Sequence, residues 1–419
     1  MSAEWFDEAR FGMFVHWGHS SQQGVELSWP LTGGVDVLPS SRPGMPVAAY
    51  ESSAATFDPA PGAAKEWAAL ARRAGMRYAV FTARHHDGYS MWPSRWSEHS
   101  VATSPCGRDL VAEFVDAFRG EGLRVGLYYS LPDWHHPDYP ALTDDDRPYG
   151  YGTGARSTPE VWDRFVTYQF GQIEELLTNY GTIDLLWFDG AWERTPAEWR
   201  ADDLLARIHE LQPSILVNDR LPGATDFITP EQFVPPEPPP QRWETCLTMN
   251  ESWGYVPGDT DYKSARALVH TLCEVAARGG NLLLNVSPRG DGSLPPEQVE
   301  RLETVAAWMD RHGDSIVATS PGLAPWQWYG PSTRAGDRVF LHLLARPYDT
   351  VTVRGVPVRR VESVCDLGTG ATLRFRPRVS VVDQILRNAD PVGELQIEVP
   401  AGVADDLATV LELRLTAPT

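Results

Sequence analysis

Asp189 is the residue whose place in the sequence most suggests chemistry. It follows an apolar run, residues 183–188, that is long enough for a strand buried on both faces. Trp187 and Trp192 flank it. Indole rings offer flat apolar faces to the C–H groups of sugars, so an acid in this setting suggests chemistry on a carbohydrate. The same acid could instead cap the following helix, and this stretch alone does not decide between the two.

Hydrolysis of a glycosidic bond also needs a second carboxyl group across the scissile bond. This group protonates the leaving oxygen, so it should lie in partly apolar surroundings that keep it protonated near neutral pH. Glu231 fits because it lies among apolar residues within 227–233, beside a proline-rich segment. Glu244, in Arg-Trp-Glu-Thr, is its rival. The residue types around the two acids favour Glu231 only weakly, so both remain candidates for the second carboxyl group.

Three histidines, His16, His85 and His86, also fall at the ends of predicted strands. They could bind a metal or sugar hydroxyls. His-x-His and His-Glu-x-x-His spacings do not occur here, and the four cysteines show no metal-ligand spacing. Imidazole both donates and accepts hydrogen bonds, which suits hydroxyl groups, and Arg220 can fork onto a hydroxyl or a carboxylate. We therefore do not expect a metal here, and the three histidines could equally bind sugar hydroxyls or serve as structural hydrogen-bonding groups.

Alternating strands and helices are predicted to position these residues. Each polar cluster comes after a strand and before a helix, which is where (β/α)₈ barrels place their active sites. A doubly wound open sheet is the alternative, but no Gly-x-Gly-x-x-Gly opens a helix. The predicted strands are 10–18, 78–82, 124–130, 183–188, 215–217 and 281–286, and the predicted helices are 62–74, 110–119, 159–179, 197–211, 264–278 and 296–311. An eighth strand is not evident, so we expect an irregular barrel.

The pattern changes near Ser320, which suggests a catalytic domain over 1–320 and an accessory domain over 321–419. Short β-rich runs there predict a small antiparallel β-sandwich. The runs are 339–344, 350–353, 371–375, 395–399 and 410–415. Earlier in the chain, 33–61 is rich in Gly, Pro and Ser and predicts a long loop.

The net charge of −20 argues against nucleic acid or an anionic membrane as a partner, because binding phosphates needs basic patches. It is compatible with a neutral substrate. No signal peptide or membrane-length apolar run is visible, so the cytoplasm is the expected location.

Six motifs taken together resemble the α-L-fucosidases of glycoside hydrolase family 29, and they occur in order over about the first three quarters of the chain. They are Phe11-Gly12-Met13-Phe14-Val15-His16-Trp17-Gly18, His85-His86-Asp87-Gly88-Tyr89, Gly126-Leu127-Tyr128-Tyr129-Ser130, Trp187-Phe188-Asp189-Gly190, Trp243-Glu244-Thr245 with Ser252-Trp253-Gly254-Tyr255, and Gly280-Asn281-Leu282-Leu283-Leu284-Asn285-Val286.

The resemblance implies a retaining exo-hydrolase of fucosylated glycans or glycosides that needs no cofactor, with a (β/α)₈-like domain and a C-terminal β-sandwich. It places the nucleophile on Asp189 and the acid/base on Glu231. The family's common Glu-Trp pair appears here as Glu26-Leu27-Ser28-Trp29, so either end of this stretch could keep the role. The implied substrate-binding residues are His16, Glu26, Trp29, His85, His86, Tyr129, Trp187, Arg220 and Trp253.

Other functions remain open on the sequence. The chain could hydrolyse a related sugar such as an α-L-galactoside, bind fucose without turnover, or be a metal-dependent barrel hydrolase. The proline-rich segment 235–240 beside Glu231 could shape the site for the leaving group.

Overall fold

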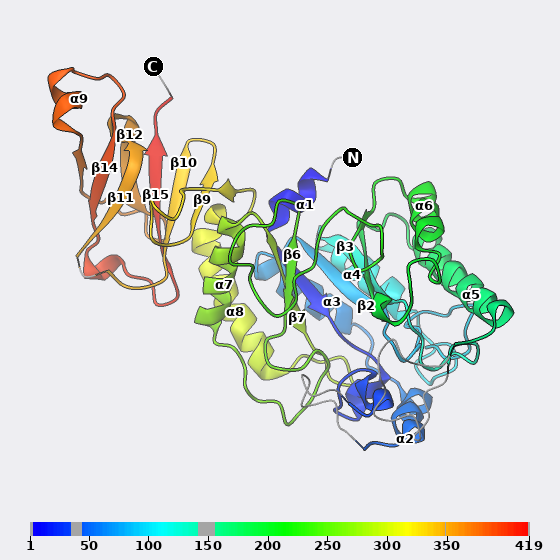
Figure 1. Cartoon of the computed structure of the whole chain (residues 1–419). Coiled ribbons are helices and arrows are strands. Elements are labelled where there is room, and N and C mark those ends of the chain that lie inside the picture. Colours follow the sequence, from blue (N-terminus) through cyan, green and yellow to red (C-terminus); the bar gives the residue numbers. More distant parts are fainter. Residues whose placement is uncertain (1–2, 35–43, 141–155, 348, 418–419) are drawn as a thin grey trace.

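The computed structural model describes residues 3–34, 44–140, 156–347 and 349–417 of the chain. Figure 1 shows a larger part, in which helices surround strands, and a smaller, mainly β part at the C-terminal end that also carries the short helix α9 (Val381–Ile385). Within the described residues the larger part contains a seven-stranded parallel sheet in the order β5-β4-β3-β2-β1-β7-β6. Its strands are β1 (Phe11–Val15), β2 (Tyr78–Arg84), β3 (Arg124–Ser130), β4 (Leu185–Asp189), β5 (Leu216–Val217), β6 (Glu244–Leu247) and β7 (Asn281–Val286).

The helices predicted between these strands are confirmed, with small differences at their ends. Polar side chains cap several of them: Asp109 accepts a hydrogen bond from the backbone N–H of Ala112 at 2.8 Å, and Ser264 accepts one from Ala267 at 3.1 Å. The helices are α3 (Ala63–Arg73), α4 (Leu110–Gly120), α5 (Pro159–Thr178), α6 (Ala201–Leu211), α7 (Ala265–Ala277) and α8 (Pro296–His312), with the short α1 (Glu4–Ala9) before β1.

Two details of the larger part differ from the sequence-based predictions. The stretch 33–61 is not wholly a loop, because its described part contains α2 (Val47–Glu51) and the 3-10 helix η4 (Ser52–Thr56), while 35–43 lie outside the described residues. Strand β6 was not predicted, because it begins with the polar residues Glu244 and Thr245, which interrupt the apolar pattern.

The two edges of the parallel sheet are joined by an irregular segment, 227–232, that takes the place of an eighth strand. It makes isolated β-bridges on both sides, and Gln232 N donates to Cys246 O at 3.0 Å. The bridges pair Phe227 with Asn218 beyond β5, and Ile228 and Glu231 with Trp243 and Cys246 at β6. The predicted (β/α)₈-like barrel is thus confirmed in an irregular form, and the irregular segment carries Glu231.

Side chains alternate between two buried faces along each strand. On β4, Leu185 and Trp187 pack in an inner cluster with Tyr128, whereas Leu186 and Phe188 pack in the larger cluster that includes the helices. Asp189 continues the inner face beyond Trp187. The inner face opens at the carboxyl ends of the strands, which is the end where barrel enzymes hold their reactive groups.

The smaller part confirms the predicted C-terminal sandwich. It contains antiparallel sheets ordered β12-β15-β10-β9-β8 and β11-β14-β13, with a core of its own. Their strands are β8 (Ser320–Pro321), β9 (Ser332–Ala335), β10 (Arg338–Leu343), β11 (Thr350–Pro357), β12 (Val361–Asp366), β13 (Phe375–Arg378), β14 (Val392–Glu398) and β15 (Thr409–Leu415); the short helix α9 (Val381–Ile385) precedes β14. The strand predicted at 371–375 was misplaced, since β13 begins at Phe375.

The two parts touch through α8, where the Trp308 indole N–H donates to Ala408 O at 2.8 Å. Among the described residues, none of the helices is both long enough and apolar enough to cross a membrane.

Candidate active site

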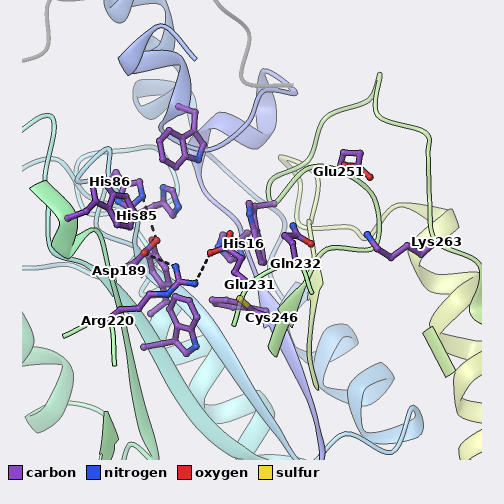
Figure 2. Close-up of a pocket in the computed structure, with 16 residues that line it drawn as sticks. His16, His85, His86, Asp189, Arg220, Glu231, Gln232, Cys246, Glu251 and Lys263 are labelled. Carbon is purple, nitrogen blue, oxygen red and sulfur yellow. Dashed lines mark hydrogen bonds and ion pairs between the residues drawn. The ribbon is translucent and has the colours of Figure 1, made fainter. Parts of the chain in front are cut away.

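A cavity of about 700 Å³ opens at the carboxyl ends of the parallel strands (Figure 2). His16 follows β1, His85 and His86 follow β2, Asp189 ends β4 and Arg220 follows β5. The lining residues are Phe14, His16, Trp29, His85, His86, Tyr128, Trp187, Asp189, Trp192, Arg220, Glu231, Gln232, Cys246, Glu251, Trp253 and Lys263. Sequence reasoning therefore brought together most of the residues that the structure gathers in one cavity.

The Asp189 carboxylate points into this cavity and is held on several sides. Its Oδ1 lies 2.9 Å from Arg220 Nη1, and its Oδ2 accepts a hydrogen bond of 2.9 Å from the Tyr128 hydroxyl. His86 Nε2 lies 3.7 Å from Oδ2. The next helical turn begins after Gly190 and has no side-chain cap. The geometry therefore favours a chemical role for Asp189 over a helix cap.

Arg220 also joins Asp189 to the second carboxylate. Its Nη2 lies 2.6 Å from Glu231 Oε2, so one guanidinium holds both acids toward the same space (Figure 2). Burial lowers the pKa of Arg220, but the Asp189 and Glu231 carboxylates outweigh burial and the net shift is upward. The side chain of Glu231 is 39% exposed. The expectation of apolar surroundings for Glu231 was wrong, because its carboxylate is ion-paired at the open side of the cavity.

The backbone after Glu231 is held in an unusual conformation. Gln232 has a φ of 61°, in the left-handed region that non-glycine residues seldom adopt. Its side-chain amide bonds Thr248, donating to the hydroxyl at 3.0 Å and accepting from the backbone N–H at 3.3 Å. These bonds to the segment after β6 stabilise the turn. This turn sets the direction in which the Glu231 side chain extends from the backbone.

Glu244, the rival acid, lies beneath the cavity and does not line it. It is fully buried, and its carboxylate accepts hydrogen bonds from the Tyr78 hydroxyl and from the Trp187 indole N–H, the latter at 2.9 Å. Burial raises the pKa of Glu244 to about 7. Trp187 in turn stacks its ring beneath the Arg220 guanidinium, whose Cζ is 4.5 Å from the ring centre. The contacts of Glu244 therefore support the floor of the site.

The three histidines are buried, and burial lowers the pKa of each to about 3, so they are neutral at pH 7. His16 Nδ1 lies 2.7 Å from Asn285 Oδ1, which can only accept, so the proton is on Nδ1 and Nε2 is free to accept. The Asn285 amide is itself oriented by donating to Trp253 O at 2.7 Å.

The tautomer of His86 follows in the same way. The Ser130 hydroxyl donates to Pro132 O at 2.8 Å, so it accepts from His86 Nδ1, which lies 2.5 Å away. His86 Nε2 is buried and has no partner. Two acceptors, His86 Nε2 and Asp189 Oδ2, thus face each other across 3.7 Å. A substrate hydroxyl placed there could donate to either one.

The assignment of Tyr129 to the site was wrong, and the neighbouring Tyr128 lies there instead. The Tyr129 ring packs on the outer face of β3, and its hydroxyl donates to Gln172 Oε1 at 3.0 Å. Tyr128 stacks on Trp187 and bonds Asp189. Alternation along the strand places only one of the two tyrosines on the inner face.

Of the two candidates near the first strand, Trp29 lines the cavity and Glu26 does not. The Trp29 ring lies edge-on to His86, with centres 5.4 Å apart. Glu26 is buried, and its carboxylate accepts from the backbone N–H groups of Trp253 and Gly254 at 2.9 and 2.7 Å. Glu26 therefore holds Trp253 in the cavity wall, where the indole packs against His16 with ring centres 4.9 Å apart.

Sequence reasoning left the place of Trp192 open and missed several other lining residues. The half-exposed Trp192 ring lies 5.9 Å from His86, centre to centre. Gln232, Glu251 and Lys263 carried no recognisable motif. Across the described residues, the structure contains no group of three His, Cys, Asp or Glu side chains arranged to hold a metal ion.

An acidic pair at the mouth of a parallel β/α barrel, set among imidazoles and indoles, defines a glycoside hydrolase. The profile of one family of such enzymes, described as alpha-L-fucosidase, matches residues 1–314. The chain belongs to this family, glycoside hydrolase family 29.

Individual relatives agree with this assignment. The tissue alpha-L-fucosidase of Homo sapiens is 32% identical over 373 residues, covering 81% of this chain and 75% of that protein. The structure of alpha-L-fucosidase isoenzyme 1 from Paenibacillus thiaminolyticus is 36% identical and superposes with a TM-score of 0.84 over 99% of this chain and 98% of that one. A Bacteroides thetaiotaomicron family 29 enzyme, trapped as a covalent intermediate with 2-fluoro-fucosyl fluoride, has a TM-score of 0.82 at 26% identity, covering 98% and 95% of the two chains.

Proposed function

We propose that this protein is a retaining exo-α-L-fucosidase that releases terminal α-L-fucose from glycosides or oligosaccharides, with Asp189 as nucleophile and Glu231 as acid/base. The observation that carries the proposal is the position of Arg220, which binds both carboxylates within one cavity. A retaining mechanism needs its two carboxyl groups about 5–5.5 Å apart, and a single guanidinium can span groups at such a spacing.

The reaction takes place in two displacements at the anomeric carbon. In the first, Asp189 Oδ attacks that carbon, the glycosidic C–O bond breaks, and the Glu231 carboxyl donates its proton to the departing oxygen. In the second, the Glu231 carboxylate takes a proton from water, the water oxygen attacks the same carbon, and the bond to Asp189 breaks. Fucose leaves with its original anomeric configuration, and Glu231 is protonated again.

The remaining cavity residues are assigned to holding the sugar. His16, His85 and His86 are neutral and face ring hydroxyls, with the lone pair of His86 Nε2 accepting from one of them. The wall formed by Phe14 and Trp253 is apolar and suits the methyl group that distinguishes fucose from galactose. Trp29, Trp187 and Arg220 complete the enclosure, and Tyr128 replaces Tyr129 as the tyrosine of the site.

The test is hydrolysis of 4-nitrophenyl α-L-fucoside and of fucosylated oligosaccharides, with the first-formed product followed by NMR before it mutarotates. We expect α-L-fucose to appear first. The α-L-galactoside serves as the matched substrate, since its added hydroxyl group would meet the apolar wall, and we expect slower turnover of it. Formation of β-L-fucose first would contradict retention, and fucose binding without any turnover would contradict hydrolysis.

A further inference from the structure

We propose that Gln232, Glu251 and Lys263 form an aglycone subsite that recognises a neutral, hydroxyl-bearing sugar as the leaving group. The inference rests on the proposed fucosidase function and adds the class of aglycone. Figure 2 shows these three side chains on the opposite side of the cavity from His85 and His86, with Glu231 between the two groups. The leaving group of a fucoside must lie beyond the acid that protonates it, which is the side on which these residues stand.

The subsite is carried by a loop with a defined base. After β6 the chain runs through 248–263 to α7. The backbone N–H of Lys263 donates to Met249 O at 2.7 Å, which closes the loop. Within it, the backbone N–H of Glu251 donates to Asp259 Oδ2 at 3.0 Å. The same loop places Trp253 in the wall around His16. The loop 248–263 therefore contributes residues to both ends of the cavity.

Lys263 is half-buried, and its ammonium end points toward Gln232 in Figure 2. Its Nζ donates to Asn250 O at 3.2 Å, and an ammonium carries three N–H groups, so it can also donate to a ligand. Burial lowers the pKa of Lys263, against the opposing effects of Glu251, Asp259 and Asp261. A cation that is partly desolvated at a cavity edge gains by donating to a ligand hydroxyl.

The charges of this subsite select its ligand. Lys263 and Glu251 carry opposite charges and Gln232 adds an uncharged amide, so the three side chains together offer hydrogen-bond donors and acceptors and have no net charge. Such a set suits the hydroxyl groups of a neutral sugar and offers little to an aromatic or alkyl group. The proline-rich segment 235–240 is not the source of this recognition. In the described structure Pro236 and Pro238 line a separate groove beside α7 and the C-terminal domain.

The experiment compares two substrates in the same variant. Lys263→Met and Glu251→Ala are assayed on 4-nitrophenyl α-L-fucoside and on a panel of neutral fucosyl disaccharides of different linkage. The readout is the ratio of kcat/KM for each disaccharide to kcat/KM for the aryl fucoside, which does not depend on the fraction of folded protein. The control is Lys65→Met, which changes the chain's other lysine, on the exposed surface of α3.

We expect the ratio to fall about tenfold or more in Lys263→Met for at least one linkage, chiefly through KM, because a hydrogen bond to a charged donor is lost. Glu251→Ala should lower it less, and Lys65→Met should not change it. An unchanged ratio for every disaccharide in both variants would overturn the aglycone subsite while leaving the fucosidase function intact. Absence of fucoside hydrolysis in the unaltered protein would instead overturn the proposed function.

Discussion

The two carboxylates of the site stand on very different structures. Asp189 ends β4, a regular strand paired on both sides, in register with Ser130 of β3. Glu231 lies in the irregular segment 227–232, which touches its neighbours through isolated bridges and turns at a left-handed Gln232. The first acid is 8% exposed as a residue and sits among aromatic rings, while the second lies at the open rim.

This difference corresponds to the two tasks proposed for them. A nucleophile must meet the anomeric carbon of one sugar in a fixed orientation, so a rigid strand is an advantage. The acid/base must act on an oxygen that belongs to a variable leaving group and later on water, so it lies where the cavity opens. Arg220 couples the two, because its guanidinium binds one carboxylate with each Nη atom.

The largest effect is expected for Asp189→Ala, which tests the acid on the regular strand β4. Without the nucleophile no glycosyl-enzyme can form, so we expect kcat to fall about 10⁴-fold or more on every fucoside, whatever its leaving group. Steady-state kinetics on aryl fucosides of graded leaving-group ability would measure this. A loss that varied with the leaving group would show that Asp189 is not the nucleophile.

Glu231→Ala tests the acid on the irregular segment 227–232, at the open rim of the cavity. We expect a loss of about 10²–10⁴-fold on natural glycosides, whose leaving oxygen needs a proton, and a much smaller loss on aryl fucosides with good leaving groups. Added azide should accelerate the variant, since an anion can attack the glycosyl-enzyme without a base. The matched control is Glu244→Gln, which should affect both kinds of substrate alike because Glu244 acts through Trp187. A leaving-group dependence in Glu244→Gln instead would assign the acid to Glu244.

The neutral histidines lead to a prediction about stability. Burial lowers the pKa of His16, His85 and His86 to about 3, whereas the unfolded chain binds their protons near pH 6.5. Below pH 6.5 the unfolded state therefore holds more protons, and the free energy of unfolding should fall as the pH drops from 6.5 toward 3, by about 1.4 kcal/mol per pH unit for each histidine. Stability should be unaffected by these groups above pH 6.5.

Urea unfolding at pH 7, 6 and 5 measures this slope. His16→Asn and His85→Asn should each reduce it by the contribution of one proton. An unchanged slope in both would mean that these imidazoles are protonated in the folded protein, and it would remove the basis for treating them as neutral acceptors.

The sequence predicts the position of Asp189 well and the surroundings of Glu231 poorly, for physical reasons. Asp189 and the helices α3 to α8 follow from local apolar patterns and strand ends. The path of 227–232 depends on isolated bridges to Asn218, Trp243 and Cys246 in the flanking segments, and no periodic pattern within 227–232 encodes these bridges. The surroundings of Glu231 were misjudged for the same reason: its apolar sequence neighbours are not what surrounds its carboxylate.

The tyrosine error has a different cause. Both faces of a parallel strand inside a barrel are buried, so the apolar run in β3 does not reveal which side chains point inward. The register does: Tyr128 is level with Trp187, and Ser130 is level with Asp189, so inward residues on β3 have even numbers. With this strand pairing known, Tyr128 would have been predicted as the tyrosine that faces the cavity.

The pair Tyr128→Phe and Tyr129→Phe tests this last distinction with identical chemical changes at adjacent positions. Tyr128→Phe removes the hydrogen bond to Asp189 Oδ2, so we expect kcat/KM on the aryl fucoside to fall about tenfold. Tyr129→Phe removes a bond to Gln172 on the far side of the strand and should cost about 1 kcal/mol of stability with little change in kcat/KM. If the two variants lost activity equally, the inner face of β3 would not distinguish these residues, and the contact between Tyr128 and Asp189 would have no catalytic consequence.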